Sequence, residues 1–345
     1  MKIYFNYKSF SELNNPFILT IGNFDGFHKG HLYIIDILKK VSSHLNVEKS
    51  VFTFVSKPSL IKTNLIKIRN ILPFEDKIKI FEELGIDNLI IQEFDENFFN
   101  MERDDFLKII ISNKNLKGFI LGENFRFGKD RKGDFDFLCN FIGKEKIKIK
   151  DFYPPANYKS DPKDKECIES NNCYILFKIN LYFENSIFIS STYIRENIEN
   201  GNLFVNKYLL YPFYIKGVVE EGKKIGRKIG FETANIYIYD QIPPKPGVYF
   251  TITEILKENS FFYSMTYVGN NFQIETHIFD FAKNIYNLYI KVYFLKRLRN
   301  NIKINSINEL KILLENDKKN IFDTYLMNNI PAKDFIKNYE KFINY

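Results

Sequence analysis

Two histidines three residues apart, His28 and His31, stand in a glycine-punctuated segment that reads GNFDGFHKGH over residues 22–31. The apolar run 17–21 precedes it and a helically periodic stretch, 32–43, follows, which predicts a strand, a turn and a helix start. Glycines let backbone N–H groups approach a polyphosphate, and a helix N-terminus favours negative charge. Two imidazoles facing such a site could stabilise a phosphoryl group during transfer. The segment predicts nucleotide chemistry, and the alternative is a tight turn whose histidines only cap the helix.

A second anion site is suggested by residues 189–195, which read ISSTYIR. Ser191 or Thr192 would cap the helix that follows, and Gly201 would end it. Capping hydroxyls at a helix start also donate hydrogen bonds to phosphates, and Arg195 would lie one turn in, pointing back at the anion. A well-capped helix and an anion site are compatible interpretations.

The elements that would position these groups alternate along the first half of the chain. Apolar runs predict strands at 17–21, 50–55, 88–92 and 117–121. Amphipathic patterns predict helices at 32–43, 74–84, 103–111 and 192–200. Such alternation implies a parallel sheet with crossover helices, whose ligands bind beyond the carboxyl ends of the strands. The polar, proline-punctuated stretch 154–172 is expected to be a long surface loop.

The pattern changes after about residue 209. Short apolar runs between Gly and Pro turns predict strands at 213–219, 234–239, 248–255, 261–268, 272–279 and 288–295, and the tail predicts helices at 307–314 and 331–343. This spacing is typical of an antiparallel barrel or sandwich. We therefore expect two domains, 1–207 and 208–345, which also suits a length of 345 residues.

Composition excludes several classes of protein. The chain has 45% hydrophobic residues and a net charge of +7, which suits an enzyme with anionic substrates. Lysines are scattered among acids, so a solvated surface is the simpler explanation of the charge. Cys139, Cys167 and Cys173 form no CxxC pair, which argues against a disulfide framework or zinc site and favours a reducing cytoplasm. No stretch reaches the roughly 18 apolar residues that span a bilayer.

The histidine segment resembles the signature of the HxGH nucleotidyltransferase superfamily, whose members join a nucleoside monophosphate to a phosphate or carboxylate and release pyrophosphate. The resemblance implies that His28 and His31 contact ATP phosphates and act in catalysis. It also implies that the site is lined by Gly22, Asn23 and Asp25.

Further motifs resemble the adenylylating module of the bacterial bifunctional riboflavin kinase/FAD synthetase family. Residues 122–128 read GENFRFG, and the resemblance implies flavin contacts from Asn124 and Arg126; the alternative is a loop with two aromatic core residues. By the same resemblance, the nucleotide phosphates would be bound by Ser191, Thr192 and Arg195. The chain departs from the family at Lys57, where a histidine is usual, and at 154–172, which looks like an insertion.

The second half resembles the riboflavin kinases of the same family. A glycine-rich loop would hold ATP through Gly222, Gly226, Arg227 and Gly230, although glycine density alone favours a flexible hairpin. Residues 232–236 read ETANI and resemble the Pro-Thr-Ala-Asn signature. That resemblance implies that Thr233 and Asn235 bind Mg²⁺ and ATP phosphates, which suits neutral oxygens. Glu232 replaces the proline, from which we expect altered geometry or metal affinity.

Residues 274–281, IETHIFDF, match the segment that supplies the general base of the kinases. The resemblance implies that Glu275 takes the proton from riboflavin's ribityl hydroxyl; the alternative is an outward residue on an alternating strand. For His277 we favour a structural role. The 265–275 loop is shorter than the family pattern, from which we expect altered flavin contacts.

The resemblance thus implies a Rossmann-like HxGH domain with a parallel sheet, followed by a six-stranded antiparallel β-barrel with terminal helices. It implies a transferase that phosphorylates riboflavin to FMN and adenylylates FMN to FAD, with ATP and Mg²⁺. We expect a cytoplasmic enzyme with small-molecule partners, no nucleic acid and no membrane; a homo-oligomer is left open. Two alternatives stand: an FMN adenylyltransferase with a degenerate kinase barrel, and a flavin- or RNA-binding protein without catalysis.

Overall fold

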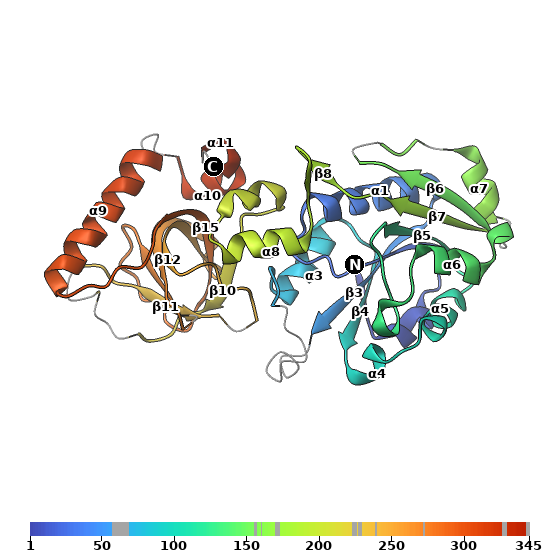
Figure 1. Ribbon diagram of the computed structural model, residues 1–345, viewed down its shortest axis with the longest axis horizontal. Helices are drawn as coiled ribbons and strands as arrows, with labels where there is room; N and C mark the ends of the chain where they lie inside the picture. Colours follow the sequence, from blue (N-terminus) through green and yellow to red (C-terminus); the bar gives the residue numbers. More distant parts are fainter. Residues whose placement is uncertain are drawn as a thin grey trace. The chain divides into compact units, whose positions relative to one another are not determined.

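The computed structural model describes residues 1–56, 69–154, 157–159, 161–169, 173–222, 226, 230–238, 240–271, 273–325 and 330–342 (Figure 1). Lys57 and Arg227, which the sequence analysis singled out, lie outside these residues. By its contacts the chain forms two compact units. Unit 1 comprises Met1–Ile68 and Phe74–Ser190, and unit 2 comprises Arg69–Pro73 and Ser191–Tyr345. Packing therefore divides the chain at 190/191, whereas the boundary between the two activities, at 207/208, stays a prediction.

Unit 1 is built on a parallel sheet of seven strands in the order β1-β4-β3-β2-β5-β7-β6. In chain order the strands are β1 (Lys2–Phe5), β2 (Phe17–Ile21), β3 (Glu48–Ser56), β4 (Asn88–Phe94), β5 (Leu116–Gly122), β6 (Ile147–Phe152) and β7 (Tyr174–Ile179). Every residue of β2 is buried, as expected for a central parallel strand covered on both faces. The predicted parallel sheet is confirmed.

Helices cover this sheet. They are α1 (Lys29–Leu45), α3 (Phe74–Glu83), α4 (Glu96–Phe99), α5 (Arg103–Ile111), α6 (Phe135–Ile142) and α7 (Pro162–Glu169), with short 3-10 turns η1 (Tyr7–Glu12), η2 (Lys129–Arg131) and η3 (Lys144–Lys146). Alternate residues of β2, Phe17 and Leu19 among them, join the apolar cluster that α5, α6 and η1 build on one face. A short hairpin, β8 (Phe183–Glu184) with β9 (Ile187–Phe188), completes the unit.

The sheet order creates a switch point between β2 and β5. From β2 the chain adds β3 and β4 on one side, and it then places β5 on the other side of β2. In parallel α/β sheets ligands bind at such a point, beyond the carboxyl ends of the strands. The segment 22–31 leaves the end of β2 and the segment 122–128 begins at the end of β5, so both predicted segments emerge at this point.

Unit 2 is a nearly closed antiparallel barrel of six strands in the order β10-β15-β12-β13-β14-β11 (Figure 1). The strands are β10 (Tyr214–Val218), β11 (Ala234–Tyr237), β12 (Gly247–Ile255), β13 (Ser260–Val268), β14 (Gln273–Ile278) and β15 (Tyr289–Arg299). An isolated bridge between Glu220 and Asn235 links the segment after β10 to β11. The predicted six-stranded barrel is confirmed.

The remaining elements of unit 2 are α8 (Ser191–Glu199), η4 (Leu203–Tyr208), α9 (Ile307–Tyr325), α10 (Ala332–Lys337) and α11 (Tyr339–Phe342). Gly201 has a φ of 79°, the left-handed conformation expected of a helix stop after α8. The predicted tail helix 331–343 is wrong as one element, because the helix breaks at Asn338, which has a φ of −128°. Helix α9 continues well beyond the predicted end at residue 314.

The expectation of a surface loop over 154–172 is wrong in part, because α7 occupies its second half. Asp164 of α7 is fully buried and contacts Lys148 Nζ at 2.7 Å and Lys150 Nζ at 2.6 Å, both on β6. Ion pairs of this kind fix the helix against the edge strand. The prolines and charges of the stretch are typical of a loop. The lysines that pair with Asp164 lie on β6, a strand that the sequence analysis missed.

The cysteines also differ from expectation. Cys167 at the end of α7 and Cys173 just before β7 form a disulfide, and Cys139 is a buried free thiol. The spacing of six residues is not a recognised motif, so only the fold brings the two sulfurs together. In the part of the chain that the structure describes, no helix is long and apolar enough to cross a membrane.

Candidate functional site

The histidine turn, residues 22–31, joins the end of β2 to the start of α1. His28 holds the N-cap position with φ −70° and ψ 165°, yet its side chain makes no capping hydrogen bond. Its ring stacks on that of His31, with centroids 3.7 Å apart and planes at 23°. This geometry argues against the capping alternative. Two imidazoles side by side at a helix N-terminus suit stabilisation of charge on a phosphate.

The backbone of the turn is strained. Phe24 and Phe27 have φ angles of 51° and 42°, and Gly26 has 83°. Positive φ is uncommon for residues other than glycine, and strained residues persist only where their surroundings hold them. Phe81 of α3 packs edge-on against both phenylalanines, with ring centroids 5.4 and 4.9 Å away. Helix α3 therefore holds the shape of the turn, in which Asp25 is fully buried.

A buried lysine one helical turn before Phe81 also reaches the histidine turn. Lys77 is 2% exposed, and its Nζ donates to the backbone oxygen of Asn23 at 2.8 Å and to its side-chain oxygen at 3.1 Å. A longer bond of 3.4 Å goes to the backbone oxygen of Phe54 on β3. The ammonium thus fixes both oxygens of Asn23, which is itself exposed at the site.

The β8–β9 hairpin supports the opposite end of the turn. Lys29 Nζ contacts both carboxylate oxygens of Glu184, at 2.9 and 3.2 Å. A Cβ on Gly30 would lie 3.2 Å from the His28 ring and 3.3 Å from Cβ of Tyr182. These are tighter than ordinary contacts, so a larger residue at position 30 would displace the His28 ring.

The loop after β5 carries the two predicted flavin contacts. Asn124 and Arg126 are both exposed. Arg126 Nη1 donates to the backbone oxygens of Phe125 at 2.8 Å and Glu123 at 3.4 Å. The Phe125 ring stacks on that of buried Phe127, with centroids 5.2 Å apart. The aromatic residues thus anchor the loop, and the polar side chains lie on its surface.

In unit 2, Asn235 and Glu275 lie directly opposite each other on β11 and β14. Directly paired side chains of an antiparallel sheet share one face, with Cβ atoms about 4.5–5.5 Å apart. Glu275 is half-buried and Asn235 is 5% exposed. Asn235 Nδ2 donates to the backbone oxygen of Thr233 at 3.3 Å, and Gln273 Nε2 donates to Asn235 Oδ1 at 3.1 Å. Glu275 can therefore be an outward residue of the alternating strand β14 and also act in the site.

The glycine-rich loop passes close to Asn235. A Cβ on Gly222 would lie 2.3 Å from the Asn235 side chain, and a Cβ on Gly226 would lie 2.0 Å from the backbone oxygen of Phe231. Gly230 has a φ of 79°. Only glycine permits such close approach at positions 222 and 226. Among the described residues of this segment, Gly222 and Gly226 are therefore required to be glycine.

His277 has the structural role that we favoured. Its Nδ1 bonds the backbone oxygen of Glu232 at 2.8 Å, and its ring packs on Phe231 with centroids 4.9 Å apart. Burial lowers the pKa of His277 below its ordinary value, although the bond to Glu232 opposes that shift. The Glu232 side chain is exposed. His277 therefore holds the backbone of Glu232, just before Thr233, by a bond that does not use the Glu232 side chain.

Among the residues that the structure describes, no group of three or more His, Cys, Asp or Glu side chains could hold a metal ion. Thr233 and Asn235 offer neutral oxygens instead, which are ligands that Mg²⁺ accepts when phosphates complete its coordination. Gly222, which has no side chain, lies directly beside the Asn235 amide. The donor set fits a magnesium ion that arrives with ATP.

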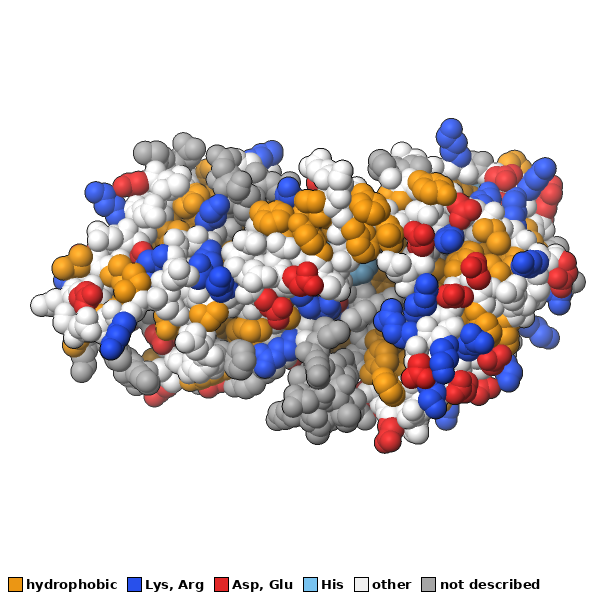
Figure 2. Space-filling model, viewed as in Figure 1, with side chains coloured by type: hydrophobic (Ala, Val, Ile, Leu, Met, Phe, Trp, Pro, Cys, Tyr) orange, Lys and Arg blue, Asp and Glu red, His pale blue; other side chains and the backbone are white. Residues whose placement is uncertain are grey.

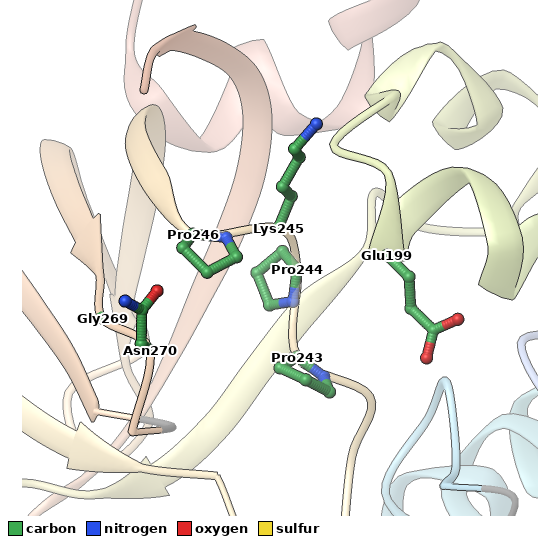
Figure 3. Close-up of a pocket in the computed structure, with 7 residues that line it drawn as sticks. All are labelled: Glu199, Pro243, Pro244, Lys245, Pro246, Gly269 and Asn270. Carbon is green, nitrogen blue, oxygen red and sulfur yellow. The ribbon is translucent and has the colours of Figure 1, made fainter. Parts of the chain in front are cut away.

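A pocket of about 210 Å³ also lies in unit 2 (Figure 3). Its lining consists of Glu199, Pro243, Pro244, Lys245, Pro246, Gly269 and Asn270. Figure 3 shows Glu199 from α8 and Asn270 on either side of the proline run. None of the predicted site residues lines this pocket, so it does not define either candidate site.

Two family models match the chain, one in each half. Residues 10–161 match FAD synthetase and residues 209–325 match riboflavin kinase. The bifunctional riboflavin kinase/FMN adenylyltransferase of Haemophilus influenzae is 31% identical over 308 residues, which cover 87% of this chain and 91% of the relative. The chain belongs to this bifunctional family. Its Bacillus subtilis member is 30% identical over 313 residues, 88% of this chain and 90% of the relative.

The fold is shared with a crystal structure described as a macrolide-efflux protein from Streptococcus pneumoniae. That structure has a TM-score of 0.73 and covers 92% of this chain and 98% of its own, at 24% sequence identity. At this identity the likeness shows the fold alone. The FAD synthetase match falls almost wholly within unit 1, and the riboflavin kinase match falls within unit 2.

In this member of the riboflavin kinase/FMN adenylyltransferase family, two sets of predicted residues lie on neighbouring elements. The histidine turn and the Asn124 loop follow the adjacent strands β2 and β5. Asn235 and Glu275 are paired across β11 and β14, with Gly222 close to Asn235. The start of α8, with Ser191, Thr192 and Arg195, packs in unit 2, where Arg195 Nε donates to the backbone oxygen of Arg69 at 3.2 Å. That these three residues bind the nucleotide phosphates at the histidine turn remains a prediction.

Sequence reasoning missed three supporting residues: Lys77, Glu184 and Gln273. Lys77 and Glu184 lie 54 and 155 residues from their partners in the histidine turn. A lysine at a buried position of an amphipathic helix was the available signal for Lys77, because an unpaired ammonium is costly to bury. We see no comparable signal for the other two.

Proposed function

We infer that this chain catalyses two successive ATP-dependent reactions of flavin cofactor synthesis: phosphorylation of riboflavin to FMN, then adenylylation of FMN to FAD. One observation carries the inference, namely that the two compact units match the models of two different activities, one each. ATP, riboflavin and FMN are the substrates that this assignment requires. Because both reactions consume ATP, we also propose the cytoplasm as its location.

In the kinase reaction, the terminal ribityl oxygen of riboflavin attacks the γ-phosphorus of ATP. A new O–P bond forms, the bond between that phosphorus and the oxygen of the leaving ADP breaks, and Glu275 takes the hydroxyl proton. Gly222, Gly226, Gly230 and Arg227 would hold the ATP phosphates. Positioning and charge neutralisation supply most of the rate in such transfers.

Magnesium is the cofactor that we propose for this site. Thr233 and Asn235 would hold the ion together with the ATP phosphates. When bound, it supplies positive charge that offsets the charge of the phosphates. Gln273, through its bond to Asn235 Oδ1, orients the Asn235 amide within the protein.

In the adenylylation, a phosphate oxygen of FMN attacks the α-phosphorus of ATP. The bond between the α-phosphorus and pyrophosphate breaks, and FAD forms. His28 and His31 would stabilise the charge at the phosphates, next to Gly22, Asn23 and Asp25. Asn124 and Arg126 would contact the flavin, whereas Ser191, Thr192 and Arg195 would contact the nucleotide phosphates.

The alternative of a degenerate kinase rests on Glu232 and the short 265–275 loop. Its support is weakened by two observations. The Glu232 side chain is exposed, while its backbone is held by His277. Thr233, Asn235 and Glu275 lie together although the proline is absent. An assay with riboflavin as the only flavin distinguishes the two hypotheses. A protein with a degenerate kinase would make no FAD from riboflavin, but it would make FAD when FMN is supplied.

A flavin-turnover assay tests the proposal. The full chain is incubated with Mg-ATP and either riboflavin or FMN, and the products are separated by chromatography. We expect FMN and FAD from riboflavin, and FAD from FMN. Wild-type protein that yields neither product from riboflavin would overturn the proposal.

Two single variants test the assignment of residues. His28→Ala should lower FAD formation by about 10²–10³-fold and leave FMN formation intact, because it removes charge stabilisation in unit 1 only. Glu275→Gln should lower FMN formation by about 10²–10⁴-fold and leave FAD formation from supplied FMN intact. If either variant stayed folded but lost both activities, the assignment of activities to units would be wrong.

A further inference from the structure

We propose that Lys77 is a positioning residue for adenylylation, which sets the orientation of the Asn23 side-chain amide so that its N–H₂ group faces the phosphate site. The inference rests on the proposed function of unit 1. Lys77 belongs to no motif of the sequence analysis, and it reaches the histidine turn from α3. Four steps lead from its contacts to this role.

The first step is the number of donors and acceptors. A lysine ammonium has three N–H donors and no acceptor. Nζ contacts the backbone oxygen of Asn23 at 2.8 Å, the side-chain oxygen of Asn23 at 3.1 Å and the backbone oxygen of Phe54 at 3.4 Å. Each of these bonds is donated by Lys77. Through them Lys77 acts on Asn23 and on the end of β3, as a positioning residue.

The second step is the orientation of the amide. Oxygen and nitrogen of an asparagine amide are told apart only by their hydrogen-bond partners. Because Lys77 can only donate, the Asn23 atom that faces it is the carbonyl oxygen. The N–H₂ group of Asn23 then lies on the other side of the amide carbon. An N–H₂ group donates to phosphate oxygens, whereas a carbonyl oxygen would repel them.

The third step is the backbone. The oxygen of Asn23 accepts from Lys77 and also from Thr53 Oγ1 at 3.3 Å. This peptide group directly precedes the strained part of the turn, which begins at Phe24 with a φ of 51°. Lys77 and Phe81 are four residues apart and therefore share one face of α3. This face holds Asn23 through Lys77 and Phe24 through Phe81.

The fourth step is energetic. Burying an ammonium costs free energy, and a well-packed apolar residue of similar volume is often neutral or stabilising in its place. Lys77 is 2% exposed, and its Nζ also lies 5.5 Å from the centre of the Phe74 ring. A methionine could fill this space. An apolar residue would lose the hydrogen bonds to the carbonyl oxygens of Asn23, which an ammonium makes.

The test compares Lys77→Met with Lys79→Met in the full chain. Lys79 lies on α3 but is exposed, so its variant is a matched control. FAD formation from FMN is measured over a range of Mg-ATP concentrations, and thermal unfolding of the full chain serves as the control for folding. We expect Lys77→Met to lower kcat/KM for ATP by about 10–100-fold, the size of a lost charged hydrogen bond. Lys79→Met should stay within two-fold of wild type.

A second variant keeps the proposal testable if Lys77→Met does not fold. Asn23→Asp keeps an oxygen for Lys77 but replaces the N–H₂ group by a carboxylate oxygen. We expect its melting temperature to equal or exceed that of wild type, because it gains an ion pair with Lys77. Its kcat/KM for ATP should fall at least ten-fold. A merely structural role of the pair predicts the opposite, namely full activity.

A double-mutant cycle tests whether Lys77 acts through the Asn23 side chain. In an Asn23→Ala background, Lys77→Met should cost several-fold less than in wild type, because the amide it orients is already gone. Equal costs in both backgrounds would overturn the proposal, and so would an active Asn23→Asp or a Lys77→Met variant within two-fold of wild type. These failures differ from failure of the proposed function, in which wild type itself makes no FAD.

Discussion

At the residue scale, the histidine turn combines strain and restraint. The left-handed Phe24 and Phe27 each carry a cost on the order of 1–3 kcal/mol. The edge-on contacts of Phe81 and the hydrogen bonds of Lys77 offset that cost. We infer that the turn keeps its shape without ligand, which suits a site that works by preorganised charge stabilisation.

His277 gives a residue-scale prediction for pH. Its pKa is lowered in the folded protein below the value of 6.5. The unfolded chain therefore binds more protons at mildly acidic pH, and the free energy of unfolding should fall as the pH drops below about 6.5. Urea unfolding of wild type and His277→Gln between pH 5 and 8 checks this. The fall should be smaller in the variant, and identical pH dependence in both proteins would contradict the assignment.

At the element scale, α7 shows how a polar stretch becomes structure. Its Asp164 is buried against Lys148 and Lys150 of β6, and Tyr158 Oη donates to Asp164 at 3.2 Å. Asp161, just before α7, also bonds Lys148 and Lys150, and these bonds, that with Lys148 foremost, lower its pKa to about 2. Helix α7 is held at the edge strand β6 by charge pairing, which periodicity in a sequence does not reveal.

The disulfide beside α7 gives the prediction at this scale. Bridging Cys167 and Cys173, six residues apart, should stabilise the fold by about 2 kcal/mol, because it restricts the unfolded chain. Dithiothreitol should therefore lower the melting temperature of wild type. It should not affect the Cys167→Ser/Cys173→Ser double variant. Cys139 does not interfere, because burial raises its pKa to about 11 and keeps it a thiol.

If dithiothreitol changed the double variant as much as wild type, the stabilisation would not come from this bridge. A Cys139→Ser variant is the matched control, since it removes the remaining thiol and leaves the bridge intact. It should keep the sensitivity to dithiothreitol.

At the scale of the whole molecule, the two sites belong to different compact units. His28 lies in unit 1 and Glu275 in unit 2. On the face that Figure 2 shows, Lys and Arg side chains are interspersed with Asp and Glu over both units. This agrees with a solvated surface as the explanation of the net charge of +7.

Separate sites predict complementation in solution. We expect His28→Ala to make FMN but very little FAD, and Glu275→Gln to make FAD only from supplied FMN. Mixed together with riboflavin and Mg-ATP, the two variants should form FAD, because FMN released by one reaches the other. Chromatography of the flavins over time checks this, with each variant alone as control. If the mixture made FMN but no FAD, while Glu275→Gln still used supplied FMN, the chain would not release its intermediate.

Much of this protein could be predicted from local sequence. The strand β2 and the helix α5 have their predicted bounds, because buried apolar runs and amphipathic periods are properties of neighbouring residues. The motif residues around His28 and Asn235 were found for the same reason, since their spacing is short. Of the main sheet, the sequence analysis missed β1, β6 and β7. Strands β1 and β6 are at the edges, where partial exposure weakens the apolar pattern, whereas β7 is an interior strand that follows the polar stretch 154–172.

The sequence by itself determined the two fold classes, the order of the modules and the chemistry of the motifs. Only the tertiary structure decided which distant side chains hold them: Lys77 at Asn23, Glu184 at Lys29 and Gln273 at Asn235. It also decided the pairing of Cys167 with Cys173. The physical reason is that burial and hydrogen bonding depend on which elements meet across the sheet, and residues far apart along the chain carry no periodic signal of their contact.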